Sequence, residues 1–500
     1  MSLISLFFIA FCILTVLVYY VVPKKAQWVV LLVASVFFYC TYGWAKIFFL
    51  LIPSVIAYIC ALLIDKVYKS ERTPEKKKKI GKAVCLIGAI SFIVLLLYVK
   101  AGNYLNLLLQ KIFKGESVTL SIIVALGVSY YVFSLISYVT DVYRKKDTAE
   151  KNYFKFLLYV IYFPKILQGP IVKHKSIANE LTAGHSFDGK LFVYGIEMML
   201  WGFFKKMVIA DRLVVFLNTT WGDLDTKPGV VVVFAGICSM FQLYCDFSGC
   251  MDILGGVSRC FGIELTKNFN HPFLSQSGAE FWRRWHITLG EWFKDYVFMP
   301  ISLGKKFVKM TKAVRNKLGV PFSRVFSVAV PLLTVWLLTG LWHNIRLEYL
   351  AWGVFWGVII IIENIHATKN GTKKEPTTVR KWLNRLKVWV FFFLSRMLTA
   401  PGSMSTSIKA FSRFASFSFA GLSVSKVFGM DWKNLVIVFV SLVLLFLVEA
   451  WEEKKGVRST LENTKPGLRI ALDVMLALFI IIFGYYGMGY NAASFVYMAY

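Results

Sequence analysis

One stretch decides how the fold of this chain is interpreted: Phe281-Trp-Arg-Arg-Trp-His-Ile-Thr-Leu-Gly-Glu-Trp-Phe-Lys-Asp-Tyr-Val-Phe-Met-Pro300. On a continuous helix its large apolar side chains fall on one face, its charged side chains fall on the other, and His286 lies at the boundary. A helix of this kind lies in a membrane interface or against a protein core and does not span a bilayer. The pattern therefore predicts an amphipathic helix over residues 281–300.

A second histidine follows an apolar run. His343 comes directly after residues 325–342, which contain no charged side chain. Titratable groups are rare in membrane-spanning segments, so a histidine at the edge of a span is a candidate for function.

The composition indicates a membrane protein. Of the 500 residues, 57% are hydrophobic and only 17% are charged, and the apolar side chains gather in runs of about 20 residues, the length that spans a bilayer. Cationic cytoplasmic loops explain the net charge of +29 better than nucleic-acid binding does. The eight cysteines form no Cys-x-x-Cys pair and lie mostly in apolar runs, so we expect neither disulfides nor a metal site.

The basic loops predict the topology. Residues 65–82, 301–324 and 367–387 are rich in lysine and arginine and are expected in the cytoplasm. These cytoplasmic loops place both termini outside the cell, which requires an even number of spans. We expect an all-α polytopic membrane protein, a bundle of about 11–12 spanning helices with re-entrant and interfacial helices, in a single domain over residues 1–500.

Three segments are more complicated than simple spans. Residues 153–175 contain two prolines and a glycine, which predict a broken or re-entrant segment buried in protein. A span expected at 190–217 is interrupted by Lys205, Lys206, Asp211 and Arg212, and we expect the adjacent acid and base to pair structurally. After a span at 229–247, the glycine-rich residues that follow are expected to be mostly loop.

Five motifs carry a family resemblance. They are Tyr162-Phe-Pro-Lys-Ile-Leu-Gln-Gly-Pro-Ile171, Phe241-Gln-Leu-Tyr-Cys-Asp-Phe-Ser-Gly249, Asn268-Phe-Asn-His-Pro-Phe273, Phe281-Trp-Arg-Arg-Trp-His-Ile-Thr-Leu-Gly290 and Leu338-Thr-Gly-Leu-Trp-His343. Together they resemble the membrane-bound O-acyltransferase (MBOAT) family, closest to the bacterial alginate O-acetylation membrane protein branch. The resemblance covers nearly the whole chain. It implies a helical membrane bundle with a narrow waist between a cytoplasmic and an external funnel.

The resemblance also implies site residues. The two family histidines map onto His286 and His343, and the position of His343 is usually taken as catalytic. The tail, residues 489–500, ends in Phe495-Val-Tyr497-Met-Ala-Tyr500, which is similar to a Phe-x-Tyr-x-x-Phe motif interpreted as an acyl relay and makes Tyr497 the expected relay residue. Because the last aromatic residue is a tyrosine here, Tyr500 stays open as the alternative.

Three further residues are candidates for binding the acyl donor. Arg283 and Arg284 could face the phosphates of a coenzyme or carrier arm, although anionic lipid headgroups explain them equally well. Asp246 could orient a site group or make a structural hydrogen bond. No bound cofactor is expected, and the donor substrate is acyl-CoA, such as acetyl-CoA, or an acyl-carrier thioester.

The expected function is membrane O-acyl transfer. A neutral imidazole suits the deprotonation of a hydroxyl that attacks a thioester. We expect an acetyl group to pass from a cytoplasmic donor across the bacterial plasma membrane, for O-acylation of an extracellular polysaccharide or cell-wall glycan with an external esterase-like acyltransferase as partner. Two alternatives stay open: D-alanyl transfer to teichoic acid from a carrier protein, and a non-enzymatic transporter or flippase, which broken segments and intramembrane charges also suit.

Overall fold

The computed structural model of the protein describes residues 1–112, 126–370, 377–415 and 430–486. These residues form helices, and their only β-type pairing is an isolated bridge between Phe269 and Trp285. The expected all-α class is therefore confirmed. The described chain divides into two compact units, residues 1–199 with 251–266 and residues 200–250 with 267–486.

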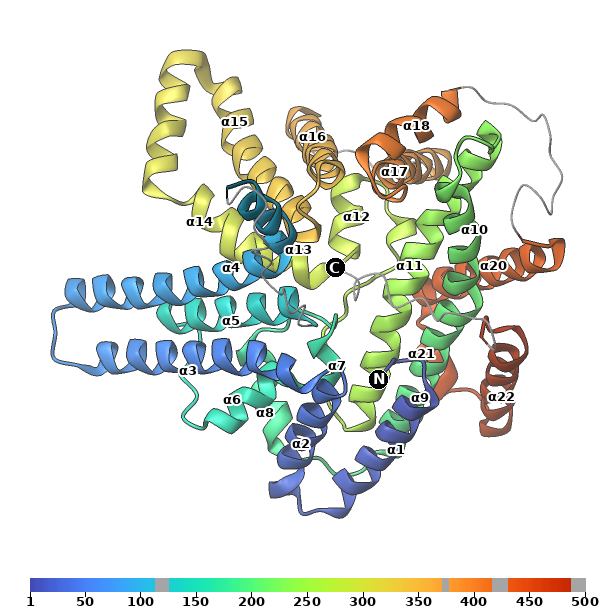
Figure 1. The fold of residues 1–500 in the computed structure, drawn as a ribbon, viewed down its shortest axis with the longest axis horizontal. Coiled ribbons are helices and arrows are strands. Elements are labelled where there is room, and N and C mark those ends of the chain that lie inside the picture. Colours follow the sequence, from blue (N-terminus) through green and yellow to red (C-terminus); the bar gives the residue numbers. More distant parts are fainter. Residues whose placement is uncertain (113–125, 371–376, 416–429, 487–500) are drawn as a thin grey trace. The chain divides into compact units, whose positions relative to one another are not determined.

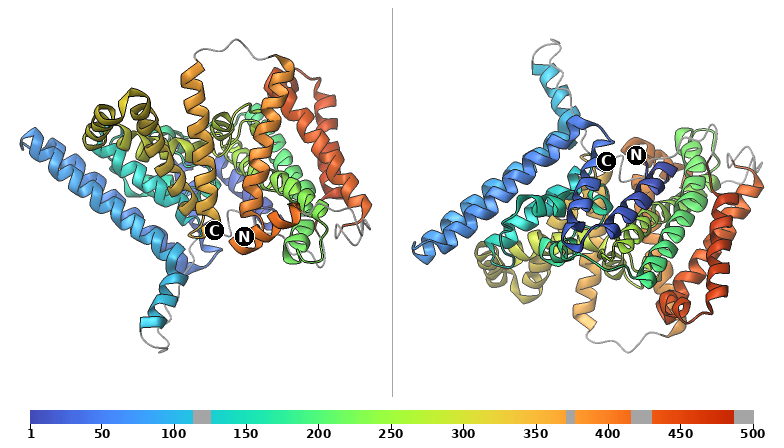
Figure 2. Two further views of the ribbon diagram at one scale, coloured as in Figure 1. Left: turned by 90° about the horizontal axis from the view of Figure 1, so that it is seen from above. Right: turned by 90° about the horizontal axis from the view of Figure 1, so that it is seen from below.

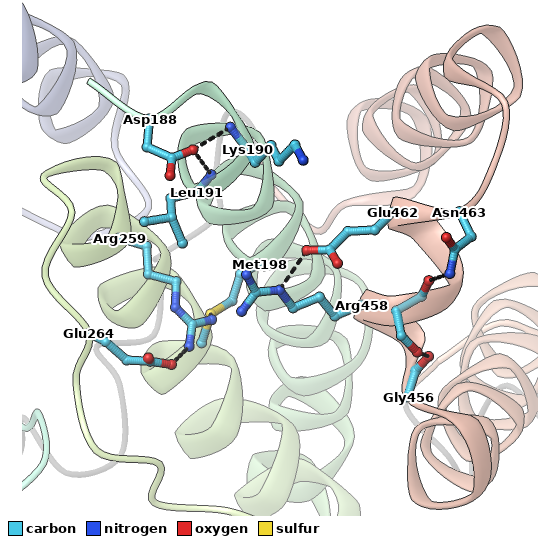
Figure 3. Close-up of polar contacts among 11 residues, drawn as sticks. Asp188, Lys190, Leu191, Met198, Arg259, Glu264, Gly456, Arg458, Glu462 and Asn463 are labelled. Carbon is cyan, nitrogen blue, oxygen red and sulfur yellow. Dashed lines mark hydrogen bonds and ion pairs between the residues drawn. The ribbon is translucent and has the colours of Figure 1, made fainter. Parts of the chain in front are cut away.

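The first unit contains the N-terminal helices. They are α1 (Leu6–Val21), η1 (Lys24–Ala26), α2 (Gln27–Cys40), η2 (Trp44–Ile47), α3 (Phe48–Lys69), α4 (Pro74–Ile112), α5 (Val128–Tyr143), α6 (Tyr153–Ile161), α7 (Phe163–Ile166), α8 (His174–Ala183) and most of α9 (Gly189–Phe203). Helices α3, α4 and α5 pack side by side (Figure 1), and Figure 2 shows their length from two other directions. The Asp188 side chain caps α9 by accepting hydrogen bonds from the backbone N–H groups of Lys190 and Leu191 (Figure 3).

The segment with two prolines is broken, as the sequence predicts. Helix α6 ends at Ile161, α7 spans only Phe163–Ile166, and no helix follows until α8 begins at His174. Every residue from 156 to 172 is buried. Irregular backbone inside a membrane protein is tolerated where protein surrounds it.

The second unit contains the remaining helices. They are π-helix η3 (Phe204–Ala210), α10 (Asp211–Gly222), most of α11 (Gly229–Cys260), η4 (Pro272–Leu274), α12 (Gly278–Arg284), α13 (Ile287–Phe293), π-helix η5 (Lys294–Phe298), α14 (Met299–Ser302), α15 (Lys305–His343), α16 (Leu347–Asn370), α17 (Thr378–Thr399), α18 (Met404–Ala415), α20 (Trp432–Lys455), α21 (Val457–Glu462) and α22 (Pro466–Phe483). Buried Arg212 on α10 donates to Asn434 on α20 and to the carbonyl of Phe483 at the end of α22.

The glycine-rich residues after position 247 are helical, so the predicted loop is wrong. Helix α11 continues to Cys260. Within the first unit, a Cβ at Gly256 would lie 2.4 Å from the Gly195 carbonyl oxygen on α9. The glycines therefore serve close helix packing, which sequence alone does not distinguish from a flexible turn.

The basic stretch 301–324, expected as a cytoplasmic connection between spans, is mostly helical as well. Helix α15 starts at Lys305 and reverses direction at Gly319, whose φ of 83° is left-handed. The Phe307 and Phe326 rings stack with centroids 5.7 Å apart, so the two arms of α15 pack against each other, as Figure 1 shows. Regular backbone hydrogen bonding thus extends through the charged sequence up to one glycine.

Seven described helical segments are long and apolar enough to cross a membrane. They are Trp44–Lys69, Pro74–Gly102, Gly229–Cys260, Lys305–His343, Leu347–Ala367, Trp432–Lys455 and Pro466–Phe483, and α1 is a shorter apolar helix. The protein is therefore a multi-pass membrane protein. The total of about 11–12 crossings stays a prediction, because it also counts segments shorter than a full span.

Candidate active site

Residues 281–300 do not form the single amphipathic helix that their pattern predicts. Helix α12 ends at Arg284, and α13 begins only after His286, whose backbone is left-handed with φ 47° and ψ 50°. Left-handed backbone is uncommon for a residue with a Cβ atom and persists where neighbouring structure imposes it. The break places the His286 side chain at a junction between two short helices.

A neighbouring segment holds this junction in place. The Asn268 carbonyl accepts a hydrogen bond from the Ile287 N–H at 3.1 Å. The Asn268 side-chain oxygen accepts two more from Thr288, at 3.1 Å from the backbone N–H and at 2.7 Å from the hydroxyl. Phe269 forms its isolated bridge with Trp285. Because these partners lie 16 to 20 residues away in sequence, helical periodicity could not reveal the break.

His286 is enclosed by aromatic rings. Its side chain is 2% exposed, and its ring centroid lies 4.9 Å from that of Phe247 on α11 and 5.8 Å from that of Trp342 on α15. Burial removes water from the charged form of the imidazole and lowers the pKa of His286 to about 3. His286 is therefore neutral at physiological pH.

His343 is the last residue of α15, where α15 meets α16. Its side chain is 8% exposed, and its ring centroid lies 5.3 Å from that of Trp352 and 6.3 Å from that of Tyr349 on α16. The two helices approach closely here, because a Cβ at Gly340 would lie only 2.4 Å from the Tyr349 carbonyl oxygen. Close packing thus fixes the end of α15 that carries His343.

Trp342 links the two histidines that the sequence analysis singled out. Its ring centroid lies 5.8 Å from that of His286 and 4.8 Å from that of His343. The structure therefore brings together two residues that are 57 positions apart in sequence. Of two buried imidazoles that share an aromatic neighbour, one can accept a proton from a hydroxyl and the other can donate a hydrogen bond to a carbonyl oxygen, which is the chemistry of acyl transfer.

Two of the three candidate donor-binding residues hold protein partners. The Asp246 carboxylate is buried and lies 2.6 Å from the Lys206 Nζ. The Arg284 guanidinium pairs with Glu280 at 3.1 Å and with Glu453 at 3.0 Å. Arg283 is exposed. Binding of donor phosphates by these residues stays a prediction.

Two other predictions concern the charged stretch 205–212 and the C-terminal tail. The charges in the 205–212 stretch do have structural partners, but not between the adjacent acid and base: the Asp211 carboxylate lies 2.8 Å from the Lys206 Nζ, and Arg212 donates to Asn434 and to the Phe483 carbonyl. Tyr497, Tyr500 and the rest of the tail 489–500 lie outside the described residues, and nothing else tests the acyl-relay role.

Sequence reasoning missed Phe247 and Trp342 as neighbours of the histidines. Both lie inside the quoted motifs, Phe247 after Asp246 and Trp342 before His343. Their presence in those motifs was the only available signal, because large aromatic residues in a chain that is 17% aromatic are otherwise unremarkable core residues.

The sequence is similar to those of known membrane acyltransferases. Residues 83–314 match the model of the MBOAT, membrane-bound O-acyltransferase family. A probable alginate O-acetylase of Azotobacter vinelandii is 30% identical over 76% of this chain and 70% of its own length. A peptidoglycan O-acetyltransferase of Helicobacter pylori is 27% identical, covering 77% and 76%. A teichoic acid D-alanyltransferase of Streptococcus thermophilus is 27% identical, covering 58% and 70%.

The family model covers the part of the site that carries His286 and ends before Trp342 and His343. The family model includes Asn268, which holds the junction, and His286, and the relative from Azotobacter extends the likeness over three quarters of the chain. A multi-pass helical protein with two buried histidines at one aromatic cluster fits the same chemistry. The chain therefore belongs to the membrane-bound O-acyltransferase family and is an acyltransferase.

Proposed function

We propose that this membrane O-acyltransferase moves an acetyl group from a cytoplasmic thioester, acetyl-CoA or an acyl carrier, to the outer face of the plasma membrane, where an extracellular polysaccharide or cell-wall glycan is O-acetylated. The observation that carries this proposal is the shared contact of His286 and His343 with Trp342. A thioester is already activated, so the enzyme has to position it and remove a proton from the attacking hydroxyl.

In this mechanism His343 is the general base. Its imidazole takes the proton of a hydroxyl as the hydroxyl oxygen attacks the thioester carbonyl carbon. The carbon–sulfur bond then breaks, and the thiolate leaves and receives that proton. His286 is neutral because of burial, so it can donate one ring N–H hydrogen bond to the carbonyl oxygen, where negative charge develops.

The surroundings of the histidines favour acetyl over D-alanyl. Their ring contacts include Phe247, Trp342 and Trp352. An uncharged acetyl group loses little hydration when it is buried among aromatic rings, whereas the ammonium group of D-alanine loses a hydration that cation–π attraction to the rings has to offset. The likeness to a D-alanyltransferase keeps D-alanyl transfer to teichoic acid as the second candidate.

The tail supplies the proposed route to the outside. In this proposal Tyr497 is the hydroxyl that accepts the acyl group as a phenyl ester, with both termini external, and a separate external acyltransferase passes the group to the glycan. A phenol is a better leaving group than an alkyl alcohol, since its pKa near ~10 is lower, so onward transfer is favourable.

The test is label transfer in membranes. Cells expressing the wild-type protein, His343→Gln or His366→Gln would supply membranes, which receive either labelled acetyl-CoA or a D-alanyl carrier thioester. His366 is an exposed histidine on α16, so its variant controls for loss of any histidine. Losing a general base reduces the rate by about 10²–10⁴-fold, so His343→Gln should lose acetyl transfer and His366→Gln should retain it.

The outcomes separate the candidates. Wild-type label transfer by a folded His343→Gln protein would end the catalytic assignment. Transfer of D-alanyl but not of acetyl would replace the proposed acyl group. Transport of a glycan precursor without transfer of any label would favour the alternative that the protein is a transporter.

A further inference from the structure

Two buried lysines on the π-helix η3 contact the part of α11 that carries Phe247. The seven residues of η3, Phe204–Ala210, form i to i+5 hydrogen bonds, and the Asp211 N–H continues the pattern by donating to the Lys206 carbonyl. This geometry brings residues five positions apart onto one side of the helix. It explains how the Lys206 ammonium reaches the Asp211 carboxylate at 2.8 Å.

The same two lysines contact α11 on both sides of Phe247. The Lys206 Nζ lies 2.6 Å from Asp246, the residue before Phe247, and the Lys205 Nζ donates to the hydroxyl of Ser248, the residue after it, at 3.0 Å. All four polar side chains are buried. The position and rotation of α11 at Phe247 are therefore set by η3.

Close backbone packing also holds this part of α11 against η3. A Cβ at Gly249 would lie 2.8 Å from the Gly202 carbonyl oxygen and 3.3 Å from the Lys206 backbone nitrogen. Only a glycine allows α11 to approach the end of α9 and the start of η3 so closely. Backbone contact and side-chain pairing thus act on the same short segment.

The part of α11 that η3 holds contacts the candidate site through Phe247. The Phe247 ring meets the His286 ring edge to face, with centroids 4.9 Å apart and an interplanar angle of 78°. His286 sits on a left-handed junction, so its orientation depends on the groups packed against it. We propose that Lys205 and Lys206 are positioning residues that orient the His286 ring through Phe247.

Positional specificity is the physical reason to bury these charges. An ion pair inside a protein loses hydration, and apolar side chains of similar volume give equal or greater stability. Its benefit is a fixed geometry, because an ammonium group between two carboxylates accepts few alternative arrangements. The catalytic consequence of this positioning rests on the proposed role of His286.

The experiment combines a double-mutant cycle with a direct view of the ring. Lys206→Met, Phe247→Leu and the double variant would be compared for kcat, for the donor KM and for the histidine ring signals in ¹³C-histidine-labelled protein. The chain has only six histidines, so the His286 signal can be assigned with a His286→Phe variant. Lys227→Met is the control, because Lys227 is a buried lysine of the same unit outside this network.

We expect Lys206→Met to shift the His286 signal and to lower kcat by about 10–10²-fold with the donor KM unchanged, since a small misplacement of a reacting group affects the chemical step. The loss should be much smaller in the Phe247→Leu background, and Lys206→Arg should restore most of the activity. Lys227→Met should match the wild type.

Each contrary outcome is distinct. An unchanged His286 signal in folded Lys206→Met protein overturns the inference whatever the activity. A shifted signal with normal kcat leaves the positioning intact and refutes the catalytic role of His286. If Lys206→Met does not fold, the double variant Lys205→Met with Ser248→Ala is tested in its place. It removes a hydrogen-bond donor together with its acceptor, and the same outcomes for the His286 signal and for kcat support or refute the inference.

Discussion

Replacing Gly340 by alanine should impair catalysis far more than folding. Gly340 lies where α15 meets α16, and the added Cβ would come within 2.4 Å of the Tyr349 carbonyl oxygen. An ordinary contact needs about 3.5 Å, so the two helices have to separate by roughly 1 Å at this point. His343 lies less than one helical turn further along α15 and moves with it.

In Gly340→Ala two effects on the free energy of unfolding partly cancel, whereas nothing offsets the loss of transfer rate. Overpacking of this kind costs about 1–3 kcal/mol. Alanine is more favourable than glycine in a helix by about 0.5–1 kcal/mol, so the free energy of unfolding should fall by about 0–2.5 kcal/mol. A displacement of about 1 Å in a catalytic group costs roughly 10²-fold in rate, and no other term offsets it.

The assay is label transfer by purified protein in lipid nanodiscs, with heat unfolding measured on the same samples. Gly467→Ala is the matched control, because a Cβ on that α22 residue meets no atom of the described residues within 4 Å. Its activity should equal that of the wild type. If folded Gly340→Ala transfers label at the wild-type rate, the spacing of α15 and α16 does not position His343, and the reasoning is refuted.

Three further predictions follow from other residues. Burial lowers the pKa of His286 from 6.5 to about 3, so on acidification the unfolded chain binds a proton that the folded protein does not, and the free energy of unfolding falls between pH 6.5 and about 3. His286→Phe should remove about 2 kcal/mol of the loss between pH 6.5 and 5, and equal acid sensitivity in both proteins would contradict this. Tyr497→Phe should abolish polymer acetylation in cells and leave the amount of membrane protein unchanged; loss of acetylation in Tyr500→Phe alone would move the relay to that residue. A single cysteine placed in residues 65–82 should resist an impermeant thiol reagent in intact cells and react in opened ones. Labelling in intact cells would show that the predicted orientation in the membrane is wrong.

The sequence by itself determined the class of the protein and its two central histidines. Apolar runs of about 20 residues require helices in a bilayer, because backbone polar groups there must be satisfied within the segment. The two prolines after Tyr162 made a regular span impossible, and the structure breaks there. His286 and His343 stood out because titratable groups in such surroundings are rare.

Only the tertiary structure decided how these residues work together. Helical periodicity predicted one amphipathic helix over 281–300, but hydrogen bonds from Asn268 impose a left-handed residue at His286. The contacts of Phe247 and Trp342 with the histidines depend on pairings between segments distant in the chain. Local sequence patterns describe the neighbours of a residue along one helix, whereas a catalytic site depends on which helices meet, and long-range packing sets that.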